Sequence, residues 1–150
     1  MSEAAERRVE RYLYEHIPLS AAMGVRVLRA TLQRVQLSAP LAPNLNHLDT
    51  LFGGSAVAVA TLCAWTLLHL RLQQAGLEAR LLIQRSAMEY ERPITGDFEA
   101  SCAFEDEHLW QRFRATLERR GRARTTLSAQ LLFAAEQMAR FQGDFVALAR

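Results

Sequence analysis

The stretch that decides the fold is TLFGGSAVAVATLCAWTLLHL, residues 50–70, which contains no charged side chain. Its twenty-one residues are enough to cross a bilayer as a helix of about 30 Å. However, the stretch also holds glycines and hydroxyl groups, and amphipathic strand patterns follow it. A helix that is apolar on all sides can equally lie buried at the centre of a soluble domain. We therefore predict a buried central helix over about residues 52–75, with no membrane insertion.

Two patterns precede this helix. An amphipathic helix is predicted over residues 3–16, because Val9, Leu13 and Ile17 fall on one stripe before Pro18. Residues 25–27 and 35–39 then alternate between apolar and polar side chains, which predicts two strands that form a hairpin.

The second half of the chain changes period. Alternation predicts strands over residues 79–92, 98–104 and 122–133 and a last strand that carries Phe141 and Phe145 on one face. A short helix over residues 107–120 interrupts them, and Gly121 ends it. Residues 98–104 give the clearest half-buried strand, with Ser101 expected to face outward. Mostly antiparallel strands must curl around the apolar helix, because nothing else can cover it, so the fold class is α+β.

The composition excludes several classes of protein. The 150 residues fit one domain, half of them hydrophobic, and the formal net charge of +2 does not point to nucleic acid. Cys63 and Cys102 lie in apolar runs, as expected of buried thiols in a cytoplasmic protein. The four histidines lack metal-ligand spacing, so we expect neither a metal nor a cofactor.

The segment that can carry chemistry runs from Asn46 to Ser55 and leads directly into the central helix. Paired glycines let a ligand approach the backbone, and the first amides of a helix can polarise a carbonyl group. Asp49 could activate water, and Asn46 could orient it. The alternative is structural: Asp49 or Thr50 caps the helix, and the glycines permit tight packing.

The element order, together with N-x-x-D-x-x-F-G-G at the helix start, resembles the hotdog-fold acyl thioesterases. Within them it looks most like the thioesterase domain that occurs alone or after an acetyltransferase domain. The resemblance covers about residues 17–149, and its motifs are MGV (23–25), PLAPNLNHLDTLFGGS (40–55), MEYERPITGD (88–97), RGRART (120–125) and FQGDFVAL (141–148). It implies a single domain over residues 1–150, in which an antiparallel sheet wraps a long helix. It also implies hydrolysis of an acyl-CoA or acyl-carrier-protein thioester.

The resemblance suggests roles for the loop residues. Hotdog thioesterases of the phenylacetyl-CoA type carry N-x-x-G-x-x-H-G-G, followed by an acidic residue on the helix. Here Asn46, Gly53 and Gly54 match that motif, whereas Asp49 replaces the glycine and Phe52 the histidine, and Thr61 stands near the position of the acid. Other hotdog thioesterases use an Asp just before the helix, which implies that Asp49 is the nucleophile or general base. The Gly53 and Gly54 amides would polarise the carbonyl. The expected substrate-binding residues are Phe52, Ser55, Thr61, Ser86 and Met88.

The resemblance further implies a homodimer or a dimer of dimers, with sheets joined edge to edge and each site completed by the partner chain. The third strand, with Gln84, Ser86 and Met88 on one face, is the candidate for the seam and the opposite wall of the pocket; for Met88 and Tyr90 plain packing is the alternative. The arginines at 119, 120, 122 and 124 could bind phosphates of coenzyme A or an acidic carrier protein, or form a solvated rim.

Three functions remain open from the sequence. The first is a thioesterase, and the second is a non-catalytic hotdog module that binds an acyl thioester, which the missing helix carboxylate favours. A hotdog dehydratase or hydratase ranks last, because Phe52 stands where a histidine would help.

Overall fold

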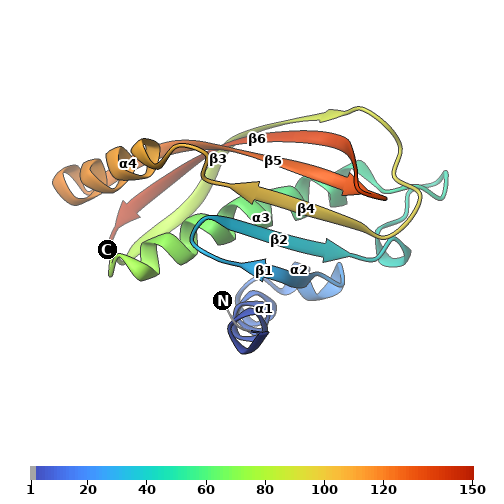
Figure 1. Cartoon of the computed structure of the whole chain (residues 1–150), viewed down its shortest axis with the longest axis horizontal. Coiled ribbons are helices and arrows are strands. Elements are labelled where there is room, and N and C mark those ends of the chain that lie inside the picture. Colours follow the sequence, from blue (N-terminus) through green and yellow to red (C-terminus); the bar gives the residue numbers. More distant parts are fainter. Residues whose placement is uncertain (1–2) are drawn as a thin grey trace.

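A computed structural model describes residues 3–150, in which six antiparallel strands curve around one long helix (Figure 1). The strands are β1 (Arg26–Ala30), β2 (Arg34–Ala39), β3 (Ala79–Tyr90), β4 (Phe98–Ala103), β5 (Arg122–Phe133) and β6 (Glu136–Ala149). The helices are α1 (Glu3–His16), α2 (Pro18–Ala22), η1 (Ala42–Asn44), α3 (Gly53–Gln74) and α4 (Glu107–Arg120). The strand order is β1-β2-β4-β5-β6-β3. This is the expected α+β hotdog arrangement, so the predicted fold class is confirmed.

Helix α3 forms the centre of the core. Its Val59, Leu67 and Leu68 are completely buried, and they belong to the same apolar cluster as Leu37 of β2 and Phe145 of β6. By length and composition, α3 is the one helix of residues 3–150 that could cross a membrane, and 67% of its most apolar window is buried inside the fold. The charge-free run is therefore accounted for by burial beneath the sheet.

One stripe of α3 is left partly open by the sheet. Ala58, Thr61, Trp65 and His69 are all half-buried, and Gly54 at the helix start is exposed. These positions are spaced by three or four residues, so they lie on one face of the helix. The stripe runs from the first turn of α3 almost to its last.

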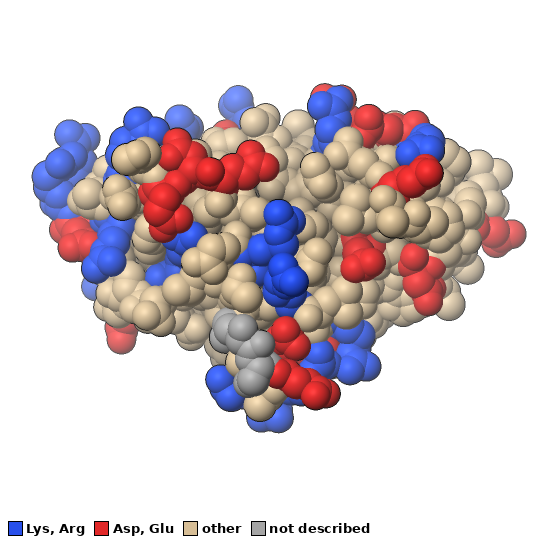
Figure 2. Space-filling model, in the orientation of Figure 1, with Lys and Arg blue, Asp and Glu red and all other residues tan. Residues whose placement is uncertain are grey.

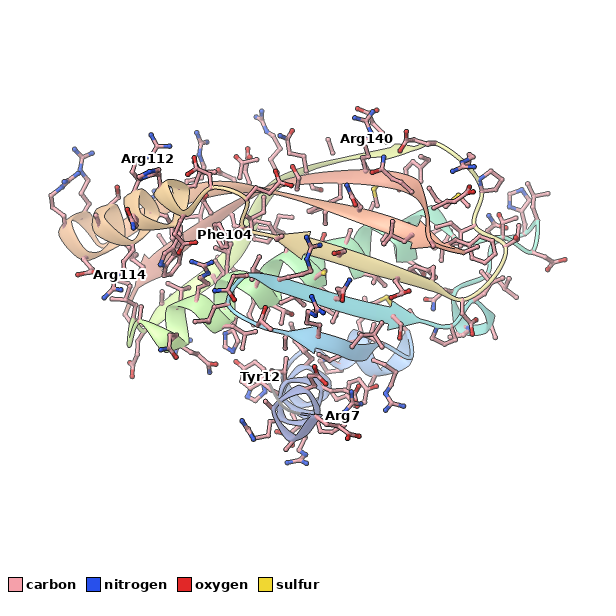
Figure 3. All side chains as sticks on the ribbon, in the orientation of Figure 1. Arg7, Tyr12, Phe104, Arg112, Arg114 and Arg140 are labelled. Atoms are coloured by element: carbon pink, nitrogen blue, oxygen red, sulfur yellow. The ribbon has the colours of Figure 1, made fainter. Side chains whose placement is uncertain are left out.

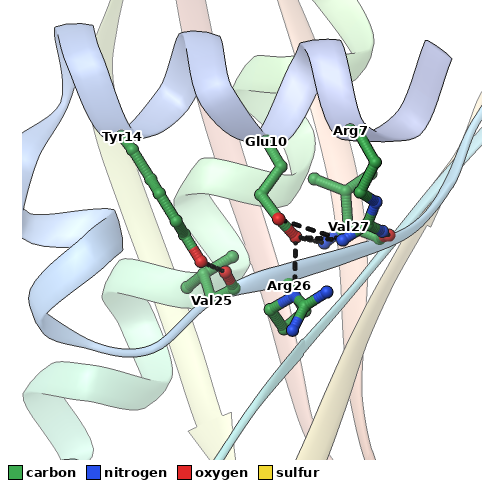
Figure 4. Close-up of polar contacts among 6 residues, drawn as sticks. All are labelled: Arg7, Glu10, Tyr14, Val25, Arg26 and Val27. Carbon is green, nitrogen blue, oxygen red and sulfur yellow. Dashed lines mark hydrogen bonds and ion pairs between the residues drawn. The ribbon is translucent and has the colours of Figure 1, made fainter. Parts of the chain in front are cut away.

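The two edges of the sheet differ. The outer edge of β1 is covered by α1, which supplies partners to its backbone (Figure 4): Arg7 Nη2 donates to Val27 O at 2.6 Å, Val27 N donates to Glu10 Oε1 at 3.0 Å, and Tyr14 Oη donates to Val25 O. β3, at the other edge, pairs only with β6 within the described residues. Its Leu82 is 57% exposed. A long strand edge without a described partner, on which Leu82 and Ile83 are exposed among charged residues, can pair with another strand.

Three local expectations are wrong. Ser101 is buried because its hydroxyl accepts a hydrogen bond of 2.6 Å from Arg34 Nη1 across the β2–β4 pair. Leu109, whose spacing predicts a place beside Trp110 on the buried side of the helix over residues 107–120, is 37% exposed. The register of β3 against β6 shifts between Ile83 and Arg85, so Gln84 falls out of the alternation that was predicted to align it with residues 86 and 88.

Helix α4 is fixed to the end of α3 through Arg71, which is almost fully buried. Its guanidinium group donates to Leu32 O and to both carboxylate oxygens of Glu107, with an Nη2–Oε2 distance of 3.0 Å. The same group lies 4.5 Å from the ring centroid of Phe104, which Figure 3 labels near the start of α4, and 5.5 Å from that of Trp110. A single cation therefore joins the central helix to the inserted one.

Candidate functional site

The base of the loop before α3 is held by a buried amide. Asn44 Nδ2 donates to Met23 O at 2.9 Å and to Pro40 O at 2.8 Å, while Asn44 O accepts from Phe52 N at 2.8 Å. Leu45 and Leu51 form an isolated antiparallel bridge just inside this contact. These bonds fix both ends of the loop before the helix begins. Sequence reasoning missed Asn44, which looks like any other turn residue.

Asn46 shapes the loop itself. Its Oδ1 accepts from Leu48 N at 2.8 Å and from Thr50 N at 3.0 Å, and its Nδ2 donates to Thr50 Oγ1 at 2.7 Å. This is an Asx-type turn, in which a side chain replaces a backbone partner. Both acceptor positions of the amide oxygen are occupied. In this structure Asn46 holds the turn that presents Asp49, rather than pointing a free amide at a ligand.

Asp49 lies at the exposed tip of that turn. Its backbone adopts a left-handed conformation with φ of 60°, which Asp tolerates better than most residues. Within residues 3–150 its carboxylate makes no hydrogen bond or ion pair. Asp49 is not among the residues that line the cavity beside the glycines. The carboxylate is therefore available to a ligand, but the loop conformation does not place it in the wall of that cavity.

The start of α3 has no side-chain cap. The N-cap residue is Phe52, in an extended conformation, so the alternative in which Asp49 or Thr50 caps the helix is wrong. The N–H groups of Gly53, Gly54 and Ser55 have no acceptor in the described part of the chain. Unpaired amides at the positive end of a 22-residue helix form a site for a carbonyl oxygen or an anion. A Cβ at Gly54 would displace the ring of Phe52, which is exposed, so the glycine lets that ring lie over the helix start.

A cavity of about 520 Å³ lies beside these amides. The loop and helix start contribute Leu51, Gly53, Gly54 and Ala56; the segment Tyr90–Ile94 and the side chains of Leu131 and Ala139 complete the wall. Tyr90 Oη donates to Gly53 O at 2.9 Å, which ties the end of β3 to the helix start. The cavity is mostly apolar and has hydrogen-bond donors at one end, as ligand sites commonly do.

The Tyr90–Ile94 wall is not among the predicted site residues, and for Tyr90 the sequence leaves plain packing as an alternative. The signal that could have identified it is the MEYERPITGD motif, since it ends a strand with a tyrosine followed by a proline turn.

The structure places the other predicted site residues in two groups. Phe52 is exposed beside the glycines, and Ser55 and Thr61 are half-buried on α3. Ser86 and Met88 pair with Gly143 and Phe141, which puts both on the inner face of β3, with Met88 packed against the core. Gly53 and Gly54 thus meet Phe52 and the end of β3, whereas Ser86 lies farther along that open edge.

A second cavity, of about 800 Å³, lies between the second half of α3, the start of β3 and α1. One wall is a stack of rings, with centroid distances of 4.0 Å for His16–Tyr12, 4.7 Å for Tyr12–His69 and 4.7 Å for Trp65–His69 (Tyr12 is labelled in Figure 3). Trp65 Nε1 donates to Leu81 O at 2.9 Å, so the indole is fixed. Burial, with a smaller effect of His16, lowers the pKa of His69 and favours its neutral form.

The remaining candidates are less specific. Arg120, Arg122 and Arg124 line a groove of about 490 Å³ together with the displaced Gln84, and none of the three arginines has an acidic partner within residues 3–150. Figure 2 shows basic side chains gathered at the α4 end of the molecule, with acidic ones among them. Burial raises the pKa of Cys102 to about 12 and that of Cys63 well above its usual value, so neither thiol is a ready nucleophile. The described residues contain no group of three His, Cys, Asp or Glu side chains that could hold a metal ion.

The chain is similar to several solved structures over nearly its whole length. A protein of unknown function from Chlorobaculum tepidum TLS is 26% identical with a TM-score of 0.92, over 97% of this chain and 95% of that one. A putative thioesterase from Shewanella oneidensis is 27% identical with a TM-score of 0.85, over 98% and 99%. A probable thioesterase from Pseudomonas aeruginosa, at 22% identity, a TM-score of 0.82 and 96% coverage of both chains, shares the fold.

The family described as "Putative thioesterase (yiiD_Cterm)" matches residues 6–149. This range takes in all six strands, the Asn46–Ser55 loop and the uncapped start of α3. Because the match covers both the fold and the site, the chain belongs to the YiiD_C family of hotdog-fold putative thioesterases.

Proposed function

We propose that this protein hydrolyses acyl thioesters of coenzyme A or of an acyl-carrier protein, in the cytoplasm. The observation that carries the proposal is the uncapped start of α3 beside an apolar cavity. A thioester carbonyl needs donors aimed at the oxygen that gains charge during attack, and backbone N–H groups at a helix start supply them. The acyl group needs an apolar space next to that carbonyl, which Ile94, Leu131 and Ala139 provide.

In the proposed reaction, the carbonyl oxygen accepts hydrogen bonds from the Gly53 and Gly54 amides. Asp49 takes a proton from water, and the hydroxide attacks the carbonyl carbon. The C–S bond then breaks, and the thiolate leaves with the proton that Asp49 carries. Direct attack by the Asp49 carboxylate, followed by hydrolysis of the anhydride, is the alternative route. Thr61 lies on the open stripe of α3, and the half-buried Ser55 lies in the first turn of the same helix; both hydroxyls can hold water.

We further propose a homodimer joined through β3, which two such dimers could extend to a tetramer. The support is the uncovered edge with its exposed Leu82 and Ile83, in contrast to the covered edge of β1. A second β3 would supply main-chain partners to this edge, and it would bring Ser86 and Met88 of each chain to the seam.

A non-catalytic module that binds an acyl thioester is the second candidate. The observation that favours it is the absence of a carboxylate from the part of α3 that borders the cavity: the helix carries Thr61 near the position where related thioesterases carry an acid, and Asp49 does not line the cavity wall.

The test is thiol release from a panel of acyl-CoAs and acyl-carrier proteins, comparing Gly53→Pro with Gly53→Ala. Proline removes one N–H group at the first helical position, where its φ fits, and the extended conformation of Phe52 suits a residue before proline. Alanine keeps the N–H group. We expect kcat to fall by about 10²-fold or more in Gly53→Pro, and only a few-fold in Gly53→Ala.

Asp49→Asn completes the design. Loss of turnover in this variant supports Asp49 as the base or nucleophile. Turnover at the wild-type rate would leave the thioesterase activity standing and show that Asp49 has no catalytic role. If the wild-type protein releases no thiol but binds a non-hydrolysable acyl-CoA thioether, the binding module is the function.

A further inference from the structure

Two surface features without a described partner, an exposed apolar loop and a cavity with an aromatic wall, lie at opposite ends of β3. At one end is the loop before α3, whose Leu48 is 69% exposed and whose Leu45 and Phe52 are also exposed. At the other end is the cavity of about 800 Å³ walled by Tyr12, Trp65 and His69. Exposed apolar side chains gathered on one loop indicate a contact surface. The cavity joins an aromatic wall to a polar rim that includes Glu78, Arg80 and Arg150, so it can take an apolar side chain with charged neighbours.

The cavity is a built structure rather than a gap between loose side chains. Its ring wall is stacked from α1 to α3, and the indole of Trp65 is held by Leu81 O. Leu72 and Leu77 add aliphatic surface at the end of α3. Such a wall offers a fixed shape to an apolar side chain, and it loses no further side-chain freedom when that side chain enters.

The geometry of the open edge relates the two features. Residues 79–82 at the start of β3 line the cavity, and Tyr90 at its end is bonded to Gly53, next to the loop. When two β3 edges pair antiparallel about their middle, the start of each strand lies beside the end of the other. The open stripe of α3 runs the same way, from Gly54 to His69. The loop of each copy thus comes to the cavity of the other.

We propose that the Leu45–Phe52 loop of one copy docks into the Tyr12–Trp65–His69 cavity of a second copy, with Leu48 entering the cavity. This inference rests on the β3-edge dimer proposed above. Charge also matches: Arg80 at the rim has no acidic partner among the described residues, and Asp49, next to Leu48, has no basic one. Glu78 at the same rim can face His47. The second copy then contacts the turn that carries Asp49 and holds that turn in place.

The first experiment measures assembly by sedimentation velocity and equilibrium. Leu48→Asp is compared with Leu19→Asp, a matched change at an exposed leucine of α2. We expect the dissociation constant of the dimer to rise by about 10-fold to 100-fold in Leu48→Asp, the range for one buried leucine, and to be unchanged in Leu19→Asp. A wild-type dimer that Leu48→Asp leaves intact overturns the docking inference.

The second experiment traps the contact directly. A chain with Leu48→Cys and a tagged chain with Leu77→Cys are unfolded, mixed, refolded and oxidised mildly. We expect a covalent heterodimer on denaturing gels, and none when Leu19→Cys replaces Leu48→Cys. Cys63 and Cys102 are buried and do not compete. Absence of the heterodimer, from mixtures that sediment as dimers, contradicts the inference even if Leu48→Asp is misfolded.

These measurements use no substrate, so their outcome is separate from that of the thiol-release assay. A wild-type chain that stays monomeric overturns both the β3-edge dimer and the docked loop. A dimer without the trapped contact overturns only the docked loop. Thiol release without docking leaves the thioesterase proposal standing.

Discussion

Replacing Arg71 by methionine should destabilise the protein more than any exposed arginine replacement. Methionine keeps the length and much of the volume of the side chain but removes the charge and every N–H donor. Arg71 is 4% exposed, whereas the side chain of its partner Glu107 is 56% exposed. The carboxylate can therefore return to water when the arginine is lost, so the cost falls on the groups around the buried guanidinium.

The magnitude follows from those groups. The charge-assisted hydrogen bond to Leu32 O contributes about 1.5–3 kcal/mol. The contacts with Phe104 and Trp110 add roughly 1–2 kcal/mol, and the half-exposed Glu107 pair adds about 0.5 kcal/mol. Burial of the methionine side chain returns about 1–2 kcal/mol. We expect a net loss of about 3 kcal/mol in the free energy of unfolding, or about 6–12 °C in Tm for a chain of this size.

The assay is urea unfolding followed by circular dichroism, with Arg114→Met as the matched control. Arg114 pairs with Glu118 on the exposed face of α4, so its loss should cost about 0.5 kcal/mol or less. The hydrogen bond from Arg71 lowers the pKa of Glu107, so the wild-type advantage is present above the ordinary carboxyl pKa and narrows as the pH falls below it. If Arg71→Met unfolds within 1 kcal/mol of wild type, an apolar group replaces the cation without cost and the reasoning is refuted.

Asn46→Ala should lower the free energy of unfolding by about 1–2 kcal/mol and speed amide hydrogen exchange at Leu48 and Thr50. Asn46→Asp keeps the acceptor oxygen and should retain most of the protection from exchange. Equal exchange in both variants would show that the turn forms without the amide oxygen. Tyr90→Phe removes the bond to Gly53 O at an exposed position, so the urea midpoint should hardly move while KM for acyl-CoA rises; a large loss of stability instead would make Tyr90 a structural tie. Because burial lowers the pKa of His69, the unfolded chain binds more protons, and stability should fall as the pH drops below the ordinary histidine pKa of about 6.5. In His69→Gln the stability should fall less steeply at low pH. An unchanged dependence of stability on pH would show that other groups cause the fall. With its pKa raised to about 12, Cys102 should react with a thiol reagent only on unfolding; rapid reaction of the native protein would contradict its burial.

The elements that the sequence predicts well are those set by local pattern. The uncharged run of residues 50–70 identifies α3, because only a helix without a solvent face can do without charge. The alternation at residues 98–104 identifies β4, and the paired glycines mark the helix start that the structure finds uncapped. Each of these signals lies within a few residues of the feature it predicts.

The features that could not be predicted depend on contacts between distant residues. Ser101 is buried because Arg34, 67 positions earlier, donates to it, and Tyr90 joins the site because it bonds to Gly53, 37 positions away. The β3 bulge at Gln84 reflects how two strands fit, which neither strand shows alone. Asn44 and Asn46 read identically as turn residues, yet one holds the base of the loop and the other its tip.

Because α1 covers the edge strand β1, it also limits how many strands from other chains could add to this sheet. A sheet with two open edges can add strands indefinitely, as in a filament. Here Arg7, Glu10 and Tyr14 bond to backbone groups of Val27 and of Val25, just before β1, so within residues 3–150 β3 is the edge left open. If two chains pair through β3 as proposed, growth of the sheet stops after one addition. In that dimer the N-terminal helix would end the sheet on each side, and its removal would expose an edge through which further chains could add.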